Sequence, residues 1–210
     1  MLKKISLFVL VLMMAVLAAC APNKEGIAAT VFGEDILKAD IEEKVEYSRK
    51  AYEISVKQIN GLTAVDAMEK AKMLEKLSKP ENYEEVLNEQ IERLVLLHEA
   101  GEKNIKADGA ECKKQAQEVF ASLKAVKEED YENYQTYLYI KESMQKKGLT
   151  EEEYIESLAE NYSENQMINL LKEDYGKNSY VLSETVSLDE AFENYTKDLV
   201  EKSKEDIIYY

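Results

Sequence analysis

Helix-start signals are the feature of this sequence that most restricts its fold. In a capping box, the N-cap side chain and a glutamate three residues later each accept a hydrogen bond from the other's backbone amide. The second half of the chain contains three such pairs: Asp108 with Glu111, Thr150 with Glu153, and Ser187 with Glu190. Apolar residues recur every three or four positions after each pair, as on the buried face of a helix. Because only 7 glycines and 2 prolines occur in 210 residues, we expect long helices and a mainly α fold.

The first half of the chain shows the same helical spacing. An apolar stripe predicts a helix over Lys38 to Ile59. Thr63 fits the N-cap of a second helix, and Pro80 suits the first turn of a third. The inward stripe expected for the second helix is Val65, Met68, Ala71, Leu74 and Leu77. His98 lies on the apolar stripe of the third helix, which predicts a neutral core or boundary histidine.

Short apolar segments near both ends of the chain predict strands. Ile27 to Phe32 runs into Gly33, which is consistent with a strand followed by a turn. Asp206 to Tyr210 is a second β-prone segment. We expect the two segments to pair in a small sheet that rests on helices, because two isolated strands are only marginally stable in water. The predicted fold class is therefore mainly α, with a small sheet that pairs the N-terminal strand with the C-terminal tail.

The first twenty residues have the parts of a secretory signal. Lys3 and Lys4 precede an apolar run from Ile5 to Ala19, which at about 1.5 Å per residue is short for a permanent membrane span. The run ends in Leu17-Ala18-Ala19-Cys20, which resembles the lipobox of bacterial lipoproteins. That resemblance implies cleavage of residues 1–19, acylation of Cys20 with fatty acid such as palmitate, and a polar tether to residue 26. An ordinary signal peptide with a chance cysteine and an uncleaved anchor are the alternatives.

The acidic composition limits the classes of partner. The formal net charge is −15, and removal of Lys3 and Lys4 with a signal peptide changes it to −17. Such a surface repels the phosphates of nucleic acids and anionic lipid headgroups, so we expect no nucleic acid partner. It attracts a basic, dynamic polypeptide. The alternative explanation is that the negative charge only keeps an anchored domain soluble.

No catalytic or metal-binding pattern occurs in the sequence. His98 is the single histidine, and no second His or Cys stands at the spacing of metal ligands. Neither a glycine-rich phosphate loop nor a G-x-S-x-G elbow is present. Cys112 falls at helical spacing with Ala116 and Phe120, which favours a small buried hydrophobe. We therefore expect no enzyme activity, no cofactor and no metal site.

One tyrosine-rich segment is a candidate client-binding surface. Its candidate residues are Tyr131, Tyr134, Tyr137, Tyr139, Ile140 and Met144. In a helix they cover most of the circumference, so the helix is either enclosed by other elements or presents an apolar surface to a partner. Tyrosine suits adaptable contacts because its ring is apolar and its hydroxyl tolerates water. Both interpretations, a helix clamped between two lobes and a client-binding surface, fit the pattern.

The order of motifs resembles the SurA/PrsA family of extracytoplasmic chaperones. The similar segments are Ile27 to Ile36, Val86 to Ile105, Asp108 to Glu111, Gly148 to Tyr154 and Ala191 to Ile208. The first two match the family's opening strand and turn and its Leu-Ile helix that ends in Gly-Ile. The third matches a helix start, and the fourth matches a helix start with the pattern Gly-Leu-Thr, acidic, Tyr. The last matches the closing helix with its short strand. The resemblance implies one SurA N-terminal-like helical domain over residues 27–210, with 27–59 packed against 187–210.

The chain departs from that family at three places. Phe32 replaces the usual Asn before Gly33, and Leu37 occupies a position where a Ser or Thr cap is usual. Many family members insert a parvulin prolyl isomerase domain of about a hundred residues. Here only Gly176 to Val186 separates the last two predicted helices, and nothing resembles the parvulin histidine motifs. The resemblance therefore implies the chaperone scaffold without prolyl isomerase activity.

The sequence thus favours an anchored extracytoplasmic lipoprotein that binds unfolded or exported proteins. The membrane contact expected for it is the N-terminal lipid on Cys20. The main alternative is an anchored scaffold lipoprotein with one specific protein partner, and a third is an enzyme with a dispersed carboxylate site. An exposed apolar groove would favour the chaperone. A flat patch complementary to one partner would favour the scaffold, and paired buried carboxylates in a cleft would favour the enzyme.

Overall fold

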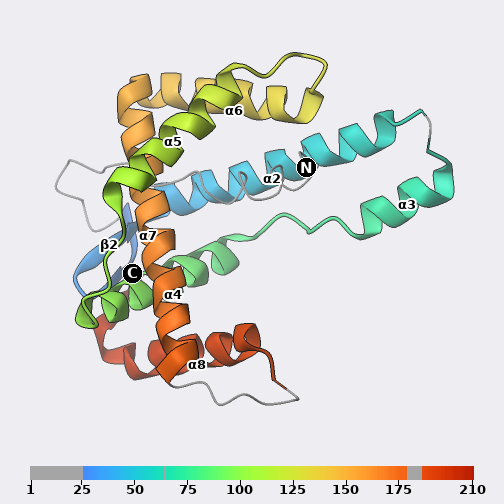
Figure 1. The fold of residues 1–210 in the computed structure, drawn as a ribbon. Coiled ribbons are helices and arrows are strands. Elements are labelled where there is room, and N and C mark those ends of the chain that lie inside the picture. Colours follow the sequence, from blue (N-terminus) through green and yellow to red (C-terminus); the bar gives the residue numbers. More distant parts are fainter. Residues whose placement is uncertain (1–25, 64, 179–185) are drawn as a thin grey trace.

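The computed structural model describes residues 26–63, 65–178 and 186–210 (Figure 1). The predicted signal peptide and Cys20 lie outside the described residues. The fold is mainly α, as predicted. Its elements are β1 (Ile27–Val31), β2 (Glu34–Leu37), α2 (Lys38–Gly61), α3 (Ala67–Glu75), α4 (Tyr83–Glu102), α5 (Gly109–Lys124), α6 (Tyr131–Lys147), α7 (Glu151–Asn178), α8 (Leu188–Lys202), a 3-10 turn η4 (Lys204–Asp206) and β3 (Ile207–Tyr209).

The two ends of the described chain meet in one antiparallel sheet of order β2-β1-β3. Val31 pairs with Ile207 and Ala29 with Tyr209, which confirms the predicted pairing of the N-terminal strand with the tail. Strand β2 was not predicted. It forms because Phe32 and Gly33 both have positive φ, 50° and 86°, as a two-residue hairpin turn requires.

Phe32 is held in this unusual conformation from two sides. Its amide donates a hydrogen bond to the carbonyl of Asp206 at 3.1 Å. Its ring stacks on His98 of α4 with 3.7 Å between ring centroids. A left-handed conformation is costly for a bulky residue, so these contacts explain how phenylalanine is tolerated before Gly33. His98 itself is exposed, so the predicted core position is wrong; within the described residues its only ring contact is the stacking on Phe32.

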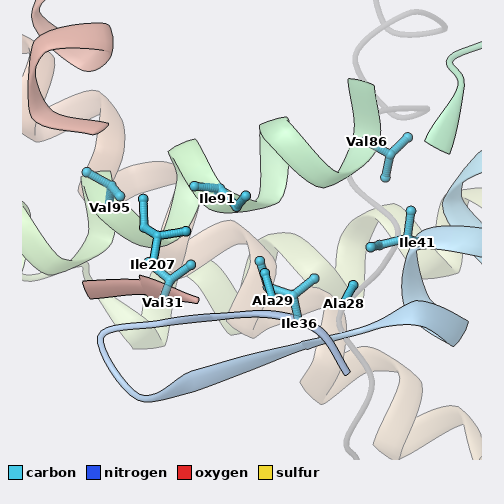
Figure 2. Close-up of a cluster of buried hydrophobic side chains, with 9 residues drawn as sticks. All are labelled: Ala28, Ala29, Val31, Ile36, Ile41, Val86, Ile91, Val95 and Ile207. Atoms are coloured by element: carbon cyan, nitrogen blue, oxygen red, sulfur yellow. The ribbon is translucent and has the colours of Figure 1, made fainter. Parts of the chain in front are cut away.

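The main hydrophobic core lies between the sheet, the start of α2 and α4 (Figure 2). Ala29, Val31, Ile41 and Val86 are each completely buried. The other buried members are Ala28, Ile36, Ile91, Val95 and Ile207. Because strand side chains alternate between faces, Ile207 points inward while its neighbour Ile208 is exposed.

Helix α7 contributes to two further hydrophobic clusters. At one end it packs with α4 and α8 around Leu171 and Phe192. At the other end it packs with α5 and α6 around Phe120 and Ile140. Cys112 on α5 is 3% exposed, in agreement with the predicted role as a small buried hydrophobe.

Two predicted helix starts are wrong by several residues. Asp66, not Thr63, is the N-cap of α3, where its carboxylate accepts from two backbone amides. Helix α4 begins at Tyr83, after Pro80, because Asn82 and Glu85 form a complete capping box. Capping by side-chain oxygens thus outweighs the local preference of proline for a first turn.

The predicted caps in the second half of the chain hold, although they differ in detail. Thr150 forms the complete box with Glu153. Asp108 and Ser187 each accept from a backbone amide of the first turn. The amide of Asp108, however, donates to the side chain of Gln166 on α7. That bond ties the start of α5 to α7.

Candidate functional site

The predicted tyrosine-rich segment forms α6, and its inner side is part of the core. Ile140 and Met144 are 3% and 9% exposed and lie in the cluster with Phe120 of α5. Tyr137 packs against the same cluster. Ile140 and Met144 therefore cannot meet a client directly, because α5 and α7 already cover this side of α6. These two side chains belong to the packing of α6 against α5 and α7.

The other tyrosines of α6 point in two further directions. Tyr131 and its helical neighbour Leu138 are about two-fifths exposed. Tyr134 lies on the same side and donates a hydrogen bond from its hydroxyl to Glu128 at 3.3 Å. Tyr139 instead packs against Tyr47 of α2, with ring centroids 5.3 Å apart. The six predicted client-binding residues thus do not form one continuous surface.

A cleft of about 230 Å³ opens where α6 crosses α2. Its walls are Glu43 and Glu46 from α2, with Tyr139, Glu142, Ser143, Lys146 and Lys147 from α6. Glu43 accepts hydrogen bonds from Lys147 and from Ser143 across the crossing. Lys146 pairs with Glu142 one turn away at 3.2 Å. Acidic groups outnumber basic ones in the cleft, and the two lysines are both engaged.

The tyrosines at this crossing are held in the neutral form. Burial, and then the nearby Glu46, Glu43 and Glu142 carboxylates, raise the pKa of Tyr139 to about 12. Burial also raises the pKa of Tyr47, whose hydroxyl has no hydrogen-bond partner within the described structure. Both phenols are therefore protonated at neutral pH, and their rings act as apolar surfaces.

A second polar cluster lies between α2, α4 and α7. Arg93 donates to Glu164 at 2.9 Å and to Asn165 at 2.8 Å. Asn165 in turn donates to the buried Asn161 at 2.9 Å. Burial, together with repulsion from Arg93, lowers the pKa of Lys44 from 10.5 to about 8. This cluster joins three helices through polar groups rather than through apolar contacts.

Helix α3 and the far half of α2 form an arm that projects from the rest of the protein (Figure 1). None of the three hydrophobic clusters of the described structure includes a residue from Tyr47 to Glu75. At about 1.5 Å per residue, Tyr47 to Gly61 alone extends roughly 22 Å. Helix α3 packs mainly on α2 and has no buried residue.

Helix α3 of this arm exposes two methionines, Met68 and Met73, and the position of Met68 differs from the predicted one. Met68 was expected on an inward stripe, but it is 70% exposed, and Met73 is 37% exposed. The expectation is wrong because α3 lies against a single helix, so only a narrow side of it is covered. The composition of α3 could have revealed its exposure, because its lysines and glutamates leave too little apolar surface for packing against two other helices.

Comparisons with protein family models, with curated proteins and with solved structures found no match. Within residues 26–63, 65–178 and 186–210, no cluster of His, Cys, Asp or Glu side chains has the arrangement of a metal site. In the same residues, no helix combines the length and the apolar character that crossing a membrane requires.

Proposed function

We propose that this chain is a membrane-anchored extracytoplasmic lipoprotein that binds unfolded or exported polypeptides. The observation that carries the proposal is the projecting α2–α3 arm, whose helix α3 exposes Met68 and Met73. Exposed apolar side chains on a projecting element that lies outside the three hydrophobic clusters favour an interaction surface. Methionine suits varied partners because its flexible, polarisable side chain adapts to many shapes.

Three further features agree with this proposal. The order of motifs resembles that of the SurA/PrsA chaperones. The net charge of −15 attracts basic segments of unfolded chains and repels nucleic acid. Tyr131 and Leu138 provide a second exposed apolar area on α6. We propose no prolyl isomerase activity, because no segment of the chain resembles the parvulin motifs.

An aggregation assay tests the proposal. The mature chain should slow the aggregation of several unrelated unfolded proteins and should show no prolyl isomerase activity. In a Met68→Ser, Met73→Ser double variant, we expect the half-maximal concentration for suppression to rise about three- to fivefold.

The matched control removes equally exposed apolar groups from another place. Ile208→Ser with Tyr209→Ser changes two exposed residues of β3, and it should leave suppression unchanged. Circular dichroism should show the same helix content in all variants. Tight binding to one protein without any effect on general aggregation contradicts the proposal and supports a scaffold lipoprotein.

The anchor is tested separately in cells. Cys20→Ala should abolish incorporation of labelled fatty acid and move the protein out of the detergent phase, because the variant lacks the acylated thiol. Cys112→Ala is the matched control, since Cys112 is buried and should not affect labelling. Undiminished labelling of the Cys20→Ala chain would show that the lipid is not on Cys20.

A further inference from the structure

The cleft between α2 and α6 has the size of a site for one side chain. Its volume of about 230 Å³ is below the roughly 300–1,000 Å³ of pockets that hold drug-sized ligands. It is open to solvent, so a guest can enter without movement of the helices. The guest that fits is therefore a single long side chain or a small group of that size.

The charges in the cleft favour a cation. Glu43 and Glu142 are each engaged by a lysine of α6. Glu46 stands exposed at the cleft, and no ion pair within the described structure involves it. An anion entering the cleft would meet lysines that are already paired and a free carboxylate beside them. A cation instead gains the attraction of Glu46 without breaking either existing pair.

The aromatic wall favours the same guest. Tyr139 and Glu46 both line the cleft, and packing against Tyr47 fixes the position of the Tyr139 ring. A lysine ammonium or an arginine guanidinium placed over an aromatic ring within about 6 Å is attracted by the ring. Arginine fits especially well, because its planar group can stack on the ring and donate to a carboxylate at once.

We infer that the α2–α6 cleft receives a lysine or arginine side chain of a bound polypeptide, held between the ring of Tyr139 and the carboxylate of Glu46. This inference rests on the proposed function and deepens it, since it names the side-chain class that the protein selects. Binding polypeptides would then combine apolar contacts at the α2–α3 arm with one cationic anchor near the root of that arm. Metal binding is not the alternative, because the described residues contain no group with the arrangement of a metal site.

Short peptides test the cleft without the aggregation assay. The probe is an unstructured peptide with one central arginine, and its control is the same peptide with citrulline, which keeps the shape and removes the charge. Titration calorimetry with the mature chain at low salt should show about three- to tenfold tighter binding of the arginine peptide. Added salt should reduce the difference.

Two variants locate the binding site. Glu46→Gln should remove most of the preference for arginine, and it should not affect folding because Glu46 is exposed. Glu118→Gln removes another exposed carboxylate, from α5, and should keep the preference. Nuclear magnetic resonance should show the ring signals of Tyr139 shifting with the arginine peptide in the unchanged chain and in Glu118→Gln.

The outcomes separate this inference from the proposed function. Equal affinity for the arginine and citrulline peptides, with suppression of aggregation intact, overturns the cationic cleft and leaves the proposed function standing. A preference for arginine that Glu46→Gln does not reduce also overturns the inference. Arginine binding that depends on Glu46, in a chain that suppresses no aggregation, supports the cleft and contradicts the proposed function.

Discussion

Replacing Ile207 by alanine should lower the free energy of unfolding by about 2–4 kcal/mol, the usual cost of truncating a buried isoleucine. Ile207 is 8% exposed and belongs to the core cluster beneath the sheet. It pairs with Val31, so its side chain holds the last strand of the chain against the first. The cost is large because α4 and the sheet cannot close over the cavity without losing strand pairing.

The adjacent isoleucine supplies the control for this experiment. Ile208 has the same side chain but is 51% exposed, so Ile208→Ala should change the free energy of unfolding by less than about 0.5 kcal/mol. Urea unfolding followed by far-ultraviolet circular dichroism measures both variants. Equal effects of the two substitutions would show that β3 does not pack as described.

Most helices could be predicted because their signals are local. The stripe that begins at Ile41 and the caps at Asp108, Thr150 and Ser187 depend only on residues within one or two turns. The pairing of the two chain ends was also predictable, since each end carries one isolated apolar segment. Strand β2 was missed because Phe32 replaces the asparagine that normally marks a two-residue hairpin turn, and its conformation is held by Asp206 and His98 from distant segments.

The candidate site was less predictable for a physical reason. Periodicity shows which residues share one side of a helix, but not whether another helix covers that side. Ile140 and Met144 are covered by α5 and α7, whereas Met68 is left open because α3 has one main packing partner. The α2–α6 cleft joins Glu43 to Ser143, which are 100 residues apart in sequence. No local pattern reports such a contact.

The polar cluster between α2, α4 and α7 contains two cations with different surroundings. Arg93 makes hydrogen bonds to Glu164 and Asn165, so its charge is compensated within the fold. For Lys44, burial and the charge of Arg93 outweigh the nearby carboxylates of Glu89, Asp40 and Glu164, and its pKa falls to about 8. Arg93 therefore has hydrogen-bond acceptors within the fold, whereas the fold penalises the charge of Lys44.

Removing these two charges should have opposite effects at pH 7. Arg93→Met leaves Glu164 and Asn165 without their donor and should lower the free energy of unfolding by about 1–3 kcal/mol. Lys44→Met keeps a long, unbranched side chain and removes a charge that is costly to bury. A fall in pKa from 10.5 to about 8 corresponds to at most about 3 kcal/mol. Because part of Lys44 still reaches solvent, we expect a gain of about 1–2 kcal/mol.

The pH dependence of stability distinguishes this explanation from a simple gain in apolar packing. Below pH 8 Lys44 is protonated in both the folded and the unfolded chain, so the full penalty is present. Between pH 8 and 10.5 the unfolded chain binds the proton more tightly, so the contribution of Lys44 to stability rises with pH. The advantage of Lys44→Met, measured by urea unfolding, should therefore shrink from pH 7 to pH 10. A constant advantage across that range would mean that improved packing, and not the buried charge, explains the gain.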